Sequence, residues 1–398
     1  MSTFDTPAGE ERWLLPEGVE ELLPAQAARV ERLRRELLDL FARWGYELVI
    51  PPLIEFTDSL LIGLGKDLDL QTFTLTDQLS GRLLGVRSDI TAQTARIDAH
   101  SLRREGPVRL CYAGSVLHTR RRSPFASRSP IQLGAELYGD ASAESDLEVV
   151  CLMLETLRRL GVREVTLDLG HVGIFRELMR ELALPRMVRE ALFDALQYKS
   201  VPAIAALVDA ADLEPADAEL LRRLASLSGG ADVLVQAREL FVERAPAACA
   251  ALDELTVLAR RIGARAPGVT LHFDLCELHG YHYHTGLVFA AYVGGQGEAV
   301  ANGGRYDDIG RVFGRARPAT GFSFDLKTLL GVLPPETAVM PSRGIFVAHE
   351  LACDAWDEVC RLRDAGERVL TGLPGQRVSA CCDRELRRAG AAWRIDTL

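Results

Sequence analysis

The chain has 398 residues, of which 48% are hydrophobic, so it is long enough to bury a full core in two or three domains. Its formal charge of -10 excludes a protein built to coat nucleic acid, because such proteins carry a basic face that displaces counterions from phosphates. No run approaches the roughly 20 apolar residues that span a bilayer, and Met1 to Glu10 is polar, so we expect a cytosolic protein. The cysteines are scattered without a C-x-x-C pair, which predicts neither disulfides nor zinc.

The first part of the chain predicts one long helix followed by strands. Pro24 to Trp44 carries apolar residues at three- and four-residue steps behind a proline, which is typical of an amphipathic helix. The segment from Tyr46 to Ile50 predicts a strand that ends at two prolines, since proline cannot donate to an inner ladder. Further strands are predicted at Phe73–Thr76, Leu83–Arg87, Val108–His118 and Ile131–Tyr138.

The middle of the chain predicts a helical insertion between two groups of strands. A helix at Glu144–Leu160 and a strand at Glu164–Leu169 precede an Ala- and Leu-rich helical stretch over 172–265. Strands are then predicted at Thr270–Leu275, Leu287–Val293 and Glu298–Asn302, with a closing helix at Ser323–Val332.

The end of the chain predicts a second, smaller domain. Leu333-Pro-Pro-Glu marks a linker, so the first domain is expected over 1–335, including the insertion, and the second over 342–398. Within the second domain the pattern predicts strand, helix, strand and helix at Gly344–His349, Leu351–Asp364, Arg368–Thr371 and Ser379–Arg388.

Three parts of the larger domain resemble the three motifs of class II aminoacyl-tRNA synthetases. These are the helix-strand unit that ends at Pro51-Pro52, the strand-loop-strand around Arg120, and the unit that ends near Leu330. The histidine enzyme is the most similar, through Gln132-Leu-Gly-Ala-Glu136 and Ala301-Asn-Gly-Gly-Arg-Tyr-Asp307. The resemblance implies an α+β fold: an antiparallel sheet flanked by helices, with a helical insertion and a small C-terminal α/β appendage.

The same resemblance implies a histidine pocket. Asp89, Thr91 and Gln132 stand where the family holds the α-amino group, Glu136 stands where a carboxylate receives an imidazole N–H, and the expected ring wall contains His279, Tyr283, His284 and Tyr306. This chemistry is sensible, because an ammonium needs converging acceptors and an imidazole needs an acceptor beside an aromatic wall.

The positions that would handle ATP differ from the family pattern. His118 and His279 stand in place of two arginines, and Asp325-Leu-Lys-Thr328 replaces a Gly-x-x-Arg clamp. Each missing arginine removes a fixed charge at a phosphate, which makes aminoacylation improbable. These departures, together with Leu110–Ser115 and Tyr281–Gly286, resemble the regulatory subunits of ATP phosphoribosyltransferase.

This second resemblance implies a non-catalytic subunit without cofactor or metal. Its expected partner is the short-form catalytic subunit of ATP phosphoribosyltransferase, with histidine as feedback effector and a homodimer inside a hetero-oligomer; membrane and tRNA binding are not expected. Two alternatives stay open: an active histidyl-tRNA synthetase, and a metal-binding or scaffolding protein whose ligands would be His279, His282 and His284.

One loop, Thr119 to Pro130, contains four arginines and no acid. They are candidate contacts for a partner protein or for phosphates, and a solvated or subunit-contacting loop is the alternative. The four residues are Arg120, Arg121, Arg122 and Arg128.

Overall fold

The computed structural model divides the chain into two compact units, Met1–Leu333 and Pro334–Leu398. The residues that it describes are 13–60, 71–121, 123, 126–182, 184–211, 213–276, 283–333, 344–379, 381–390 and 392–398. Within these residues, no helix combines the length and the apolar character needed to cross a membrane.

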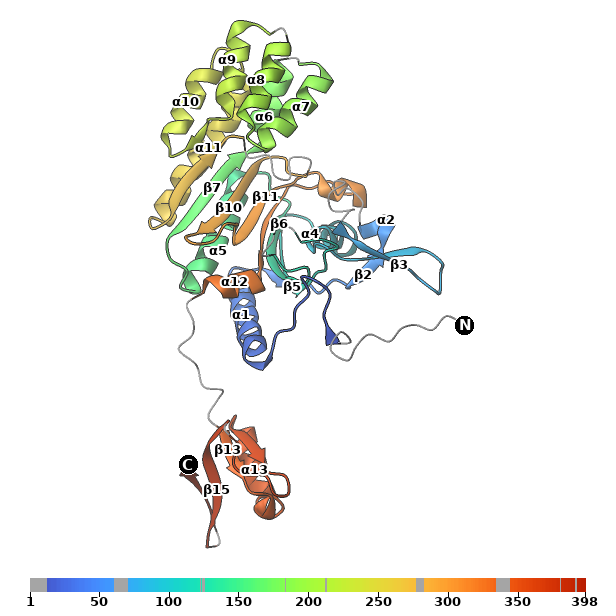
Figure 1. Ribbon diagram of the computed structural model, residues 1–398, viewed down its shortest axis with the longest axis vertical. Helices are drawn as coiled ribbons and strands as arrows, with labels where there is room; N and C mark the ends of the chain where they lie inside the picture. Colours follow the sequence, from blue (N-terminus) through green and yellow to red (C-terminus); the bar gives the residue numbers. More distant parts are fainter. Residues whose placement is uncertain are drawn as a thin grey trace. The chain divides into compact units, whose positions relative to one another are not determined.

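A nine-stranded mixed sheet forms the centre of the first unit (Figure 1). Most neighbouring strands are antiparallel, whereas β1 with β5 and β7 with β9 are parallel. The sheet is therefore less uniformly antiparallel than expected. In spatial order its strands are β1 (Glu47–Leu48), β5 (Val108–Ser115), β6 (Ile131–Tyr138), β12 (Ala319–Asp325), β11 (Ala301–Arg305), β10 (Leu287–Val293), β7 (Val165–His171), β9 (Thr270–Asp274) and β8 (Ser228–Gly229).

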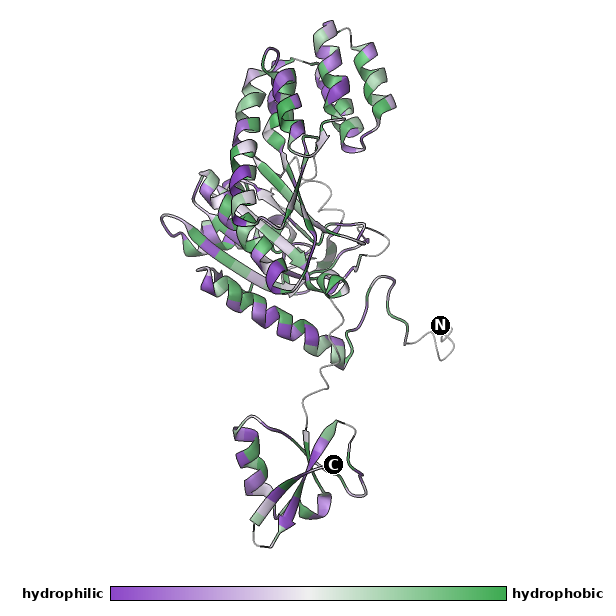
Figure 2. Ribbon diagram, turned by 90° about the vertical axis from the view of Figure 1, so that its left-hand side faces the viewer, coloured by the Kyte–Doolittle hydropathy of each residue, from purple (hydrophilic) through white to green (hydrophobic). Residues whose placement is uncertain are grey.

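The helices that pack against this sheet include α1 (Pro24–Arg43), α5 (Ala143–Arg159) and α12 (Leu326–Val332). Pro24 occupies the first turn of α1, and Gly45, with a φ of 85°, ends the turn after it. The buried side chains of α1 recur at helical spacing and include Leu37 and Phe41. Figure 2 shows the resulting alternation of hydrophobic and hydrophilic residues around the helices.

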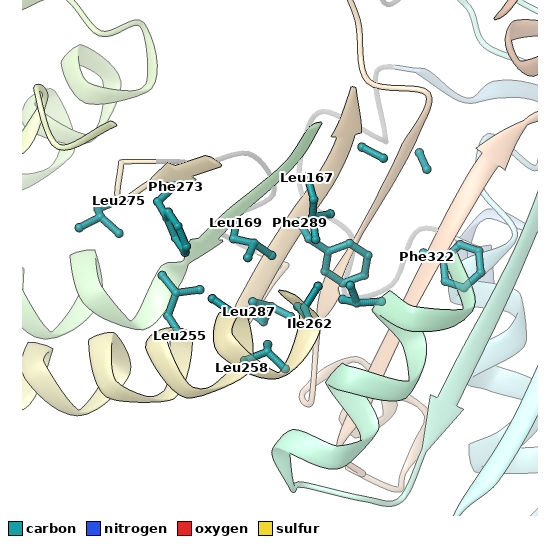
Figure 3. Close-up of a cluster of buried hydrophobic side chains, with 14 of the residues drawn as sticks. Leu167, Leu169, Leu255, Leu258, Ile262, Phe273, Leu275, Leu287, Phe289 and Phe322 are labelled. Carbon is teal, nitrogen blue, oxygen red and sulfur yellow. The ribbon is translucent and has the colours of Figure 1, made fainter. Parts of the chain in front are cut away.

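The stretch between β7 and β9 forms a group of helices, which Figure 1 shows beyond one end of the sheet. They are α6 (Val172–Glu181), α7 (Arg186–Gln197), α8 (Val201–Ala210), α9 (Pro215–Leu224), α10 (Asp232–Phe241) and α11 (Pro246–Arg265). The last helix, α11, returns to the sheet. Its side chains Leu255, Leu258 and Ile262 meet apolar residues of β7 and β10 in one buried cluster (Figure 3).

A second, smaller sheet lies away from the helical insertion in this unit (Figure 1). A three-stranded sheet has the order β2 (Ile54–Phe56), β4 (Leu83–Val86) and β3 (Phe73–Thr76), and the short helix α2 (Thr57–Leu60) follows β2. The chain then forms α4 (Thr91–Arg96), which continues into the π-helix η2 (Ile97–Leu102). A 3-10 helix, η3 (Ile309–Phe313), packs near both.

Two predicted boundaries in this unit are wrong. The predicted strand Glu298–Asn302 lies at Ala301–Arg305, where the two glycines pair with β10 and β12. The predicted helix Ser323–Val332 begins only at Leu326, because the preceding residues continue β12. Asp325 ends the strand and caps the helix: its carboxylate accepts hydrogen bonds from the backbone N–H groups of Lys327 and Thr328.

The second unit contains a four-stranded sheet in the order β14, β13, β15 and β16. Its elements are β13 (Gly344–Val347), the 3-10 helix η4 (His349–Leu351), α13 (Trp356–Asp364), β14 (Arg368–Thr371), β15 (Cys382–Ala389) and β16 (Ala392–Thr397). Helix α13 covers a small core that includes Ile345, Val347 and Leu386.

The predicted helix at Ser379–Arg388 is wrong, because this segment is mostly strand β15. Its Glu, Leu, Arg and Ala residues are good helix formers, and local propensity alone favours a helix. Strand β15 instead pairs in parallel with β13 and antiparallel with β16, so its backbone groups are satisfied on both sides. Its one fully buried side chain, Leu386, completes the core of the unit.

Candidate functional site

A buried carboxylate lies at the centre of the site. Glu136 on β6 is only 1% exposed, and it accepts hydrogen bonds from the hydroxyls of Tyr112, at 2.9 Å, and Tyr306. Opposite it in the ladder is Gly321 of β12, where an added Cβ would lie 1.5 Å from Glu136 Oε2. The Glu136 carboxylate therefore occupies the space that a side chain at position 321 would fill.

Burial raises the pKa of Glu136 to about 8. The hydrogen bonds from Tyr306 and Tyr112 act in the opposite direction, and the nearby charge of Asp89 raises the pKa further. Near neutral pH this group exists in both protonation states, so it can either accept a hydrogen bond from a ligand or share a proton with it.

Three further polar residues form one network beside Glu136. Gln132 Nε2 donates to Asp89 Oδ1 at 3.0 Å, and the backbone N–H of Thr91 donates to the same oxygen at 2.8 Å. The hydroxyl of Thr91 lies 3.1 Å from that of Tyr112, which itself donates to Glu136. Asp89 and Thr91, where α4 begins, are thus connected to both Gln132 and Glu136 on β6.

An aromatic wall closes the other side. The rings of Tyr283 and Tyr306 are stacked, with centroids 4.9 Å apart, and the ring of His284 meets Tyr283 edge-on at 5.3 Å. Within the part of the chain that the structure describes, the buried Tyr283 hydroxyl has no hydrogen-bond partner. A buried hydroxyl in this state favours a ligand that supplies a partner.

The structure brings together seven of the eight residues expected at the pocket: Asp89, Thr91, Gln132, Glu136, Tyr283, His284 and Tyr306. The eighth, His279, lies outside the described residues, as does His282 of the alternative metal site. Among the residues that are described, no group of three or more His, Cys, Asp or Glu side chains could hold a metal ion.

A cavity of about 150 Å³ adjoins this network at Gln132. Its described lining contains no lysine or arginine: it consists of Ser88, Val116, His118, Ala126, Ser127, Pro130, Gln132, Glu298, Ala299, Val300, Asn302, Ser323, Phe324, Asp325 and Thr328. Two residues that replace family arginines are in this lining. His118 Nε2 lies 2.9 Å from the carbonyl of Ser88, and the hydroxyl of Thr328 donates to Asp325.

The arginine loop is partly engaged within the chain. Arg128 donates to the carbonyl oxygens of His118 and Glu17, and its guanidinium lies over the ring of Phe73. Arg120 and Arg121 are exposed. Arg122 lies outside the described residues.

Sequence reasoning missed Tyr112, which holds one oxygen of Glu136. The available signal is Gly134, two residues before Glu136 on β6. An added Cβ at Gly134 would lie 2.5 Å from the Tyr112 hydroxyl, so the glycine provides the space that the tyrosine occupies. Arg305 of the Gly-Gly-Arg-Tyr-Asp segment has a structural role, because its guanidinium is buried with Asp146 and Ser145.

Comparisons with known proteins decide the family. A family model described as histidyl-tRNA synthetase matches residues 18–329, and one described as the ATP phosphoribosyltransferase subunit HisZ C-terminal domain matches residues 342–396. Proteins named ATP phosphoribosyltransferase regulatory subunit are 54% identical in Pseudomonas syringae pv. tomato and 56% identical in Azotobacter vinelandii, each over 99% of both chains. The chain belongs to the family of ATP phosphoribosyltransferase regulatory subunits.

Solved structures agree with this assignment. A crystal structure described as an ATP phosphoribosyltransferase regulatory subunit/histidyl-tRNA synthetase from Bacillus halodurans has a TM-score of 0.81 at 29% identity, covering 92% of this chain and 94% of that one. A histidyl-tRNA synthetase from a Nostoc species has a TM-score of 0.75 at 17% identity, covering 94% and 91%, and shows the fold alone. The expected class II synthetase-like fold is confirmed, and the relatives' names confirm the expectation of a regulatory rather than a catalytic subunit.

The raised pKa of Glu136 makes the stability of the unliganded protein depend on pH. Its folded pKa of about 8 lies above the ordinary value of 4.5, so its stabilising contribution is complete below the ordinary value and is lost as pH rises toward 8. Relative to Glu136→Gln, the wild type should lose unfolding free energy between about pH 5 and about pH 8, by at most about 1.4 kcal/mol per pH unit. Urea unfolding without histidine measures this difference, and parallel pH curves would contradict it.

Proposed function

We propose that this chain binds free histidine around Glu136 and thereby places the catalytic chain of an ATP phosphoribosyltransferase under feedback control. The single observation that carries the proposal is the continuous network from Gln132 through Asp89, Thr91 and Tyr112 to Glu136, beside stacked aromatic rings. Such a network offers acceptors at two ends of a small ligand that has one ammonium group and one aromatic N–H group.

In this proposal the two ends of histidine meet different chemistry. The α-ammonium group is received by the carboxylate of Asp89 and the side chains of Thr91 and Gln132. The imidazole N–H is received by Glu136, whose oxygens keep lone pairs free beyond the two tyrosine hydrogen bonds. The pKa of Glu136, at about 8, lies above that of an ordinary histidine ring, so the pair can share one proton at neutral pH.

The cavity beside Gln132 would receive the α-carboxylate of the ligand. Ser323 and Asn302 line it and supply neutral hydrogen-bond donors. Its lining also contains Glu298 and Asp325 and, in the part that is described, no lysine or arginine, an arrangement unsuited to triphosphate. Neutral donors can hold the single charge of a carboxylate, whereas a triphosphate needs cations to offset several charges, so the described lining supports binding of a free amino acid in preference to adenylate formation.

Control of a partner requires a ligand that prefers one arrangement of the complex, because a ligand with equal affinity for both shifts nothing. The proposed partner is the short-form catalytic subunit, which joins a homodimer of this chain. An apolar patch supports the homodimer: Leu48 on the edge strand β1 is 47% exposed, Ile50 is 84% exposed and Leu53 is 51% exposed. Arg120 and Arg121 of the arginine loop are proposed contacts for the catalytic subunit.

The two carboxyl groups of the pocket should each contribute to its affinity for histidine. Glu136→Ala or Asp89→Ala should weaken histidine binding by about 1 to 3 kcal/mol, because each removes a hydrogen bond to a charged partner in a buried setting. Isothermal titration calorimetry measures the loss, with the exposed Glu190→Ala on α7 as control. Wild-type affinity in both pocket variants would mean that histidine binds elsewhere.

The alternative function is an active histidyl-tRNA synthetase. We expect no histidine-dependent exchange of pyrophosphate into ATP, because the described cavity lining lacks the cations that fix phosphates. Exchange above a blank without protein, abolished by Glu136→Ala, would establish the synthetase function instead.

The regulatory part of the proposal is tested on the reconstituted complex. Glu136→Gln keeps the size of the side chain and replaces one acceptor oxygen with an NH2 group that cannot accept, so the histidine concentration for half-inhibition of phosphoribosyl-ATP synthesis should rise about tenfold or more. Linkage adds a reciprocal expectation. If histidine lowers the affinity of the complex for phosphoribosyl pyrophosphate by some factor, phosphoribosyl pyrophosphate should lower the affinity for histidine by the same factor. A catalytic subunit that is fully inhibited by histidine without this chain would end the regulatory hypothesis.

A further inference from the structure

The first helix of the helical insertion holds one wall of the candidate pocket by its backbone. Residues 283–286 carry Tyr283 and His284 and run past the start of α6. Arg176 of α6 donates to the carbonyl of His284 at 3.2 Å and to that of Thr285 at 3.5 Å. The N–H of Val172, the first residue of α6, donates to the carbonyl of Gly286 at 3.0 Å. Three successive carbonyl groups of the wall are thus held by one helix.

The other side of the same segment is held by the end of β11 and the residues that follow it. The N–H of Thr285 donates to the carbonyl of Arg305 at 2.7 Å, and its hydroxyl accepts from the N–H of Asp307 at 3.0 Å. The ring of His284 lies against Gly304, where an added Cβ would be 2.6 Å from it. The segment is therefore hydrogen-bonded on one side to β11 and the residues after it, and on the other side to α6.

These contacts form a continuous chain from the pocket to the insertion. Glu136 accepts from Tyr306, Tyr306 stacks on Tyr283, and the backbone that follows Tyr283 is bound by Arg176. A ligand that displaces the Tyr283 ring therefore acts on the backbone of His284 and Thr285, to which the Arg176 guanidinium group is hydrogen-bonded. Packed interiors pass such displacements on, because they have few voids to absorb them.

Helix α6 is in turn firmly joined to the rest of the insertion. Its apolar residues, including Phe175 and Leu178, are buried in the core shared with α11. His171 caps the helix by accepting from the N–H of Gly173, and its other ring nitrogen lies 3.5 Å from Glu254 of α11. Because α6 and α11 share this core, a shift of α6 also acts on α11, which packs on the central sheet (Figure 3).

We propose that Arg176 is a positioning residue through which the helical insertion holds the pocket wall and registers whether histidine is bound. This inference rests on the proposed function, since histidine is its ligand. Arginine suits the role because its planar fork can hold two adjacent carbonyls at once, whereas lysine presents a single point of contact.

The test compares Arg176→Ala, Arg176→Lys and a matched control, Arg180→Ala, in the full-length chain. Arg180 lies one turn further along α6, is exposed and pairs with Glu177 on the same helix. Histidine affinity is measured by calorimetry, and hydrogen exchange of α6 and α11 is measured with and without saturating histidine. In the wild type and in Arg180→Ala, histidine should slow exchange in both helices.

Arg176→Ala should weaken histidine binding about tenfold and remove the slowing in α6 and α11, while Arg176→Lys should restore part of both. Unchanged affinity and unchanged slowing in Arg176→Ala, or the absence of slowing in the wild type, would overturn the inference. If Glu136→Ala weakens binding while Arg176→Ala does not, only the role of Arg176 fails. If the wild type does not bind histidine, the proposed function fails and this inference fails with it.

Discussion

The site depends on a carboxylate that is removed from water and held by two tyrosines. A buried carboxylate is unfavourable unless its oxygens find donors, and Tyr112 and Tyr306 supply them from β5 and from the end of β11. This requirement links strands that are distant in the sequence but lie within one sheet. Tyr306 of the stacked wall, Tyr112 with its hydrogen bond to Thr91, and the glycine opposite Glu136 all contact that carboxylate or leave space for it.

A second constraint comes from the positions that bind ATP in synthetases. Here their replacements are used for structure: His118 binds a backbone carbonyl, and Asp325 with Thr328 closes the start of α12. Asp325 also accepts from the N–H of Ile131, so it joins the helix to the strand that bears Gln132. The described lining of the cavity is therefore held in place by these hydrogen bonds, without a lysine or arginine among its residues.

Much of this arrangement could be predicted from the sequence, for identifiable reasons. The polar acceptors and Tyr306 lie in short, distinctive segments, and such local patterns survive without structural knowledge. Gly321 could not be found in this way, and Gly134 becomes a signal for Tyr112 only once the strands are aligned, because the importance of these residues depends on strand register between residues far apart. Strand β15 was mispredicted for a related reason: its helix-forming residues are overridden by pairing with β13 and β16.

One row of ladder partners across the sheet determines where two groups of the candidate pocket lie. Glu136, Gly321 and Gly304 are direct ladder partners on three neighbouring strands, so two consecutive positions in this row have no side chain. The space above these two glycines is filled from either side: the Glu136 carboxylate lies over Gly321, and the His284 ring lies over Gly304. Beneath both groups is backbone, which has no rotamers to change. A Cβ at either glycine would displace the carboxylate or the ring, so the positions of both groups are set by the strand pairing itself.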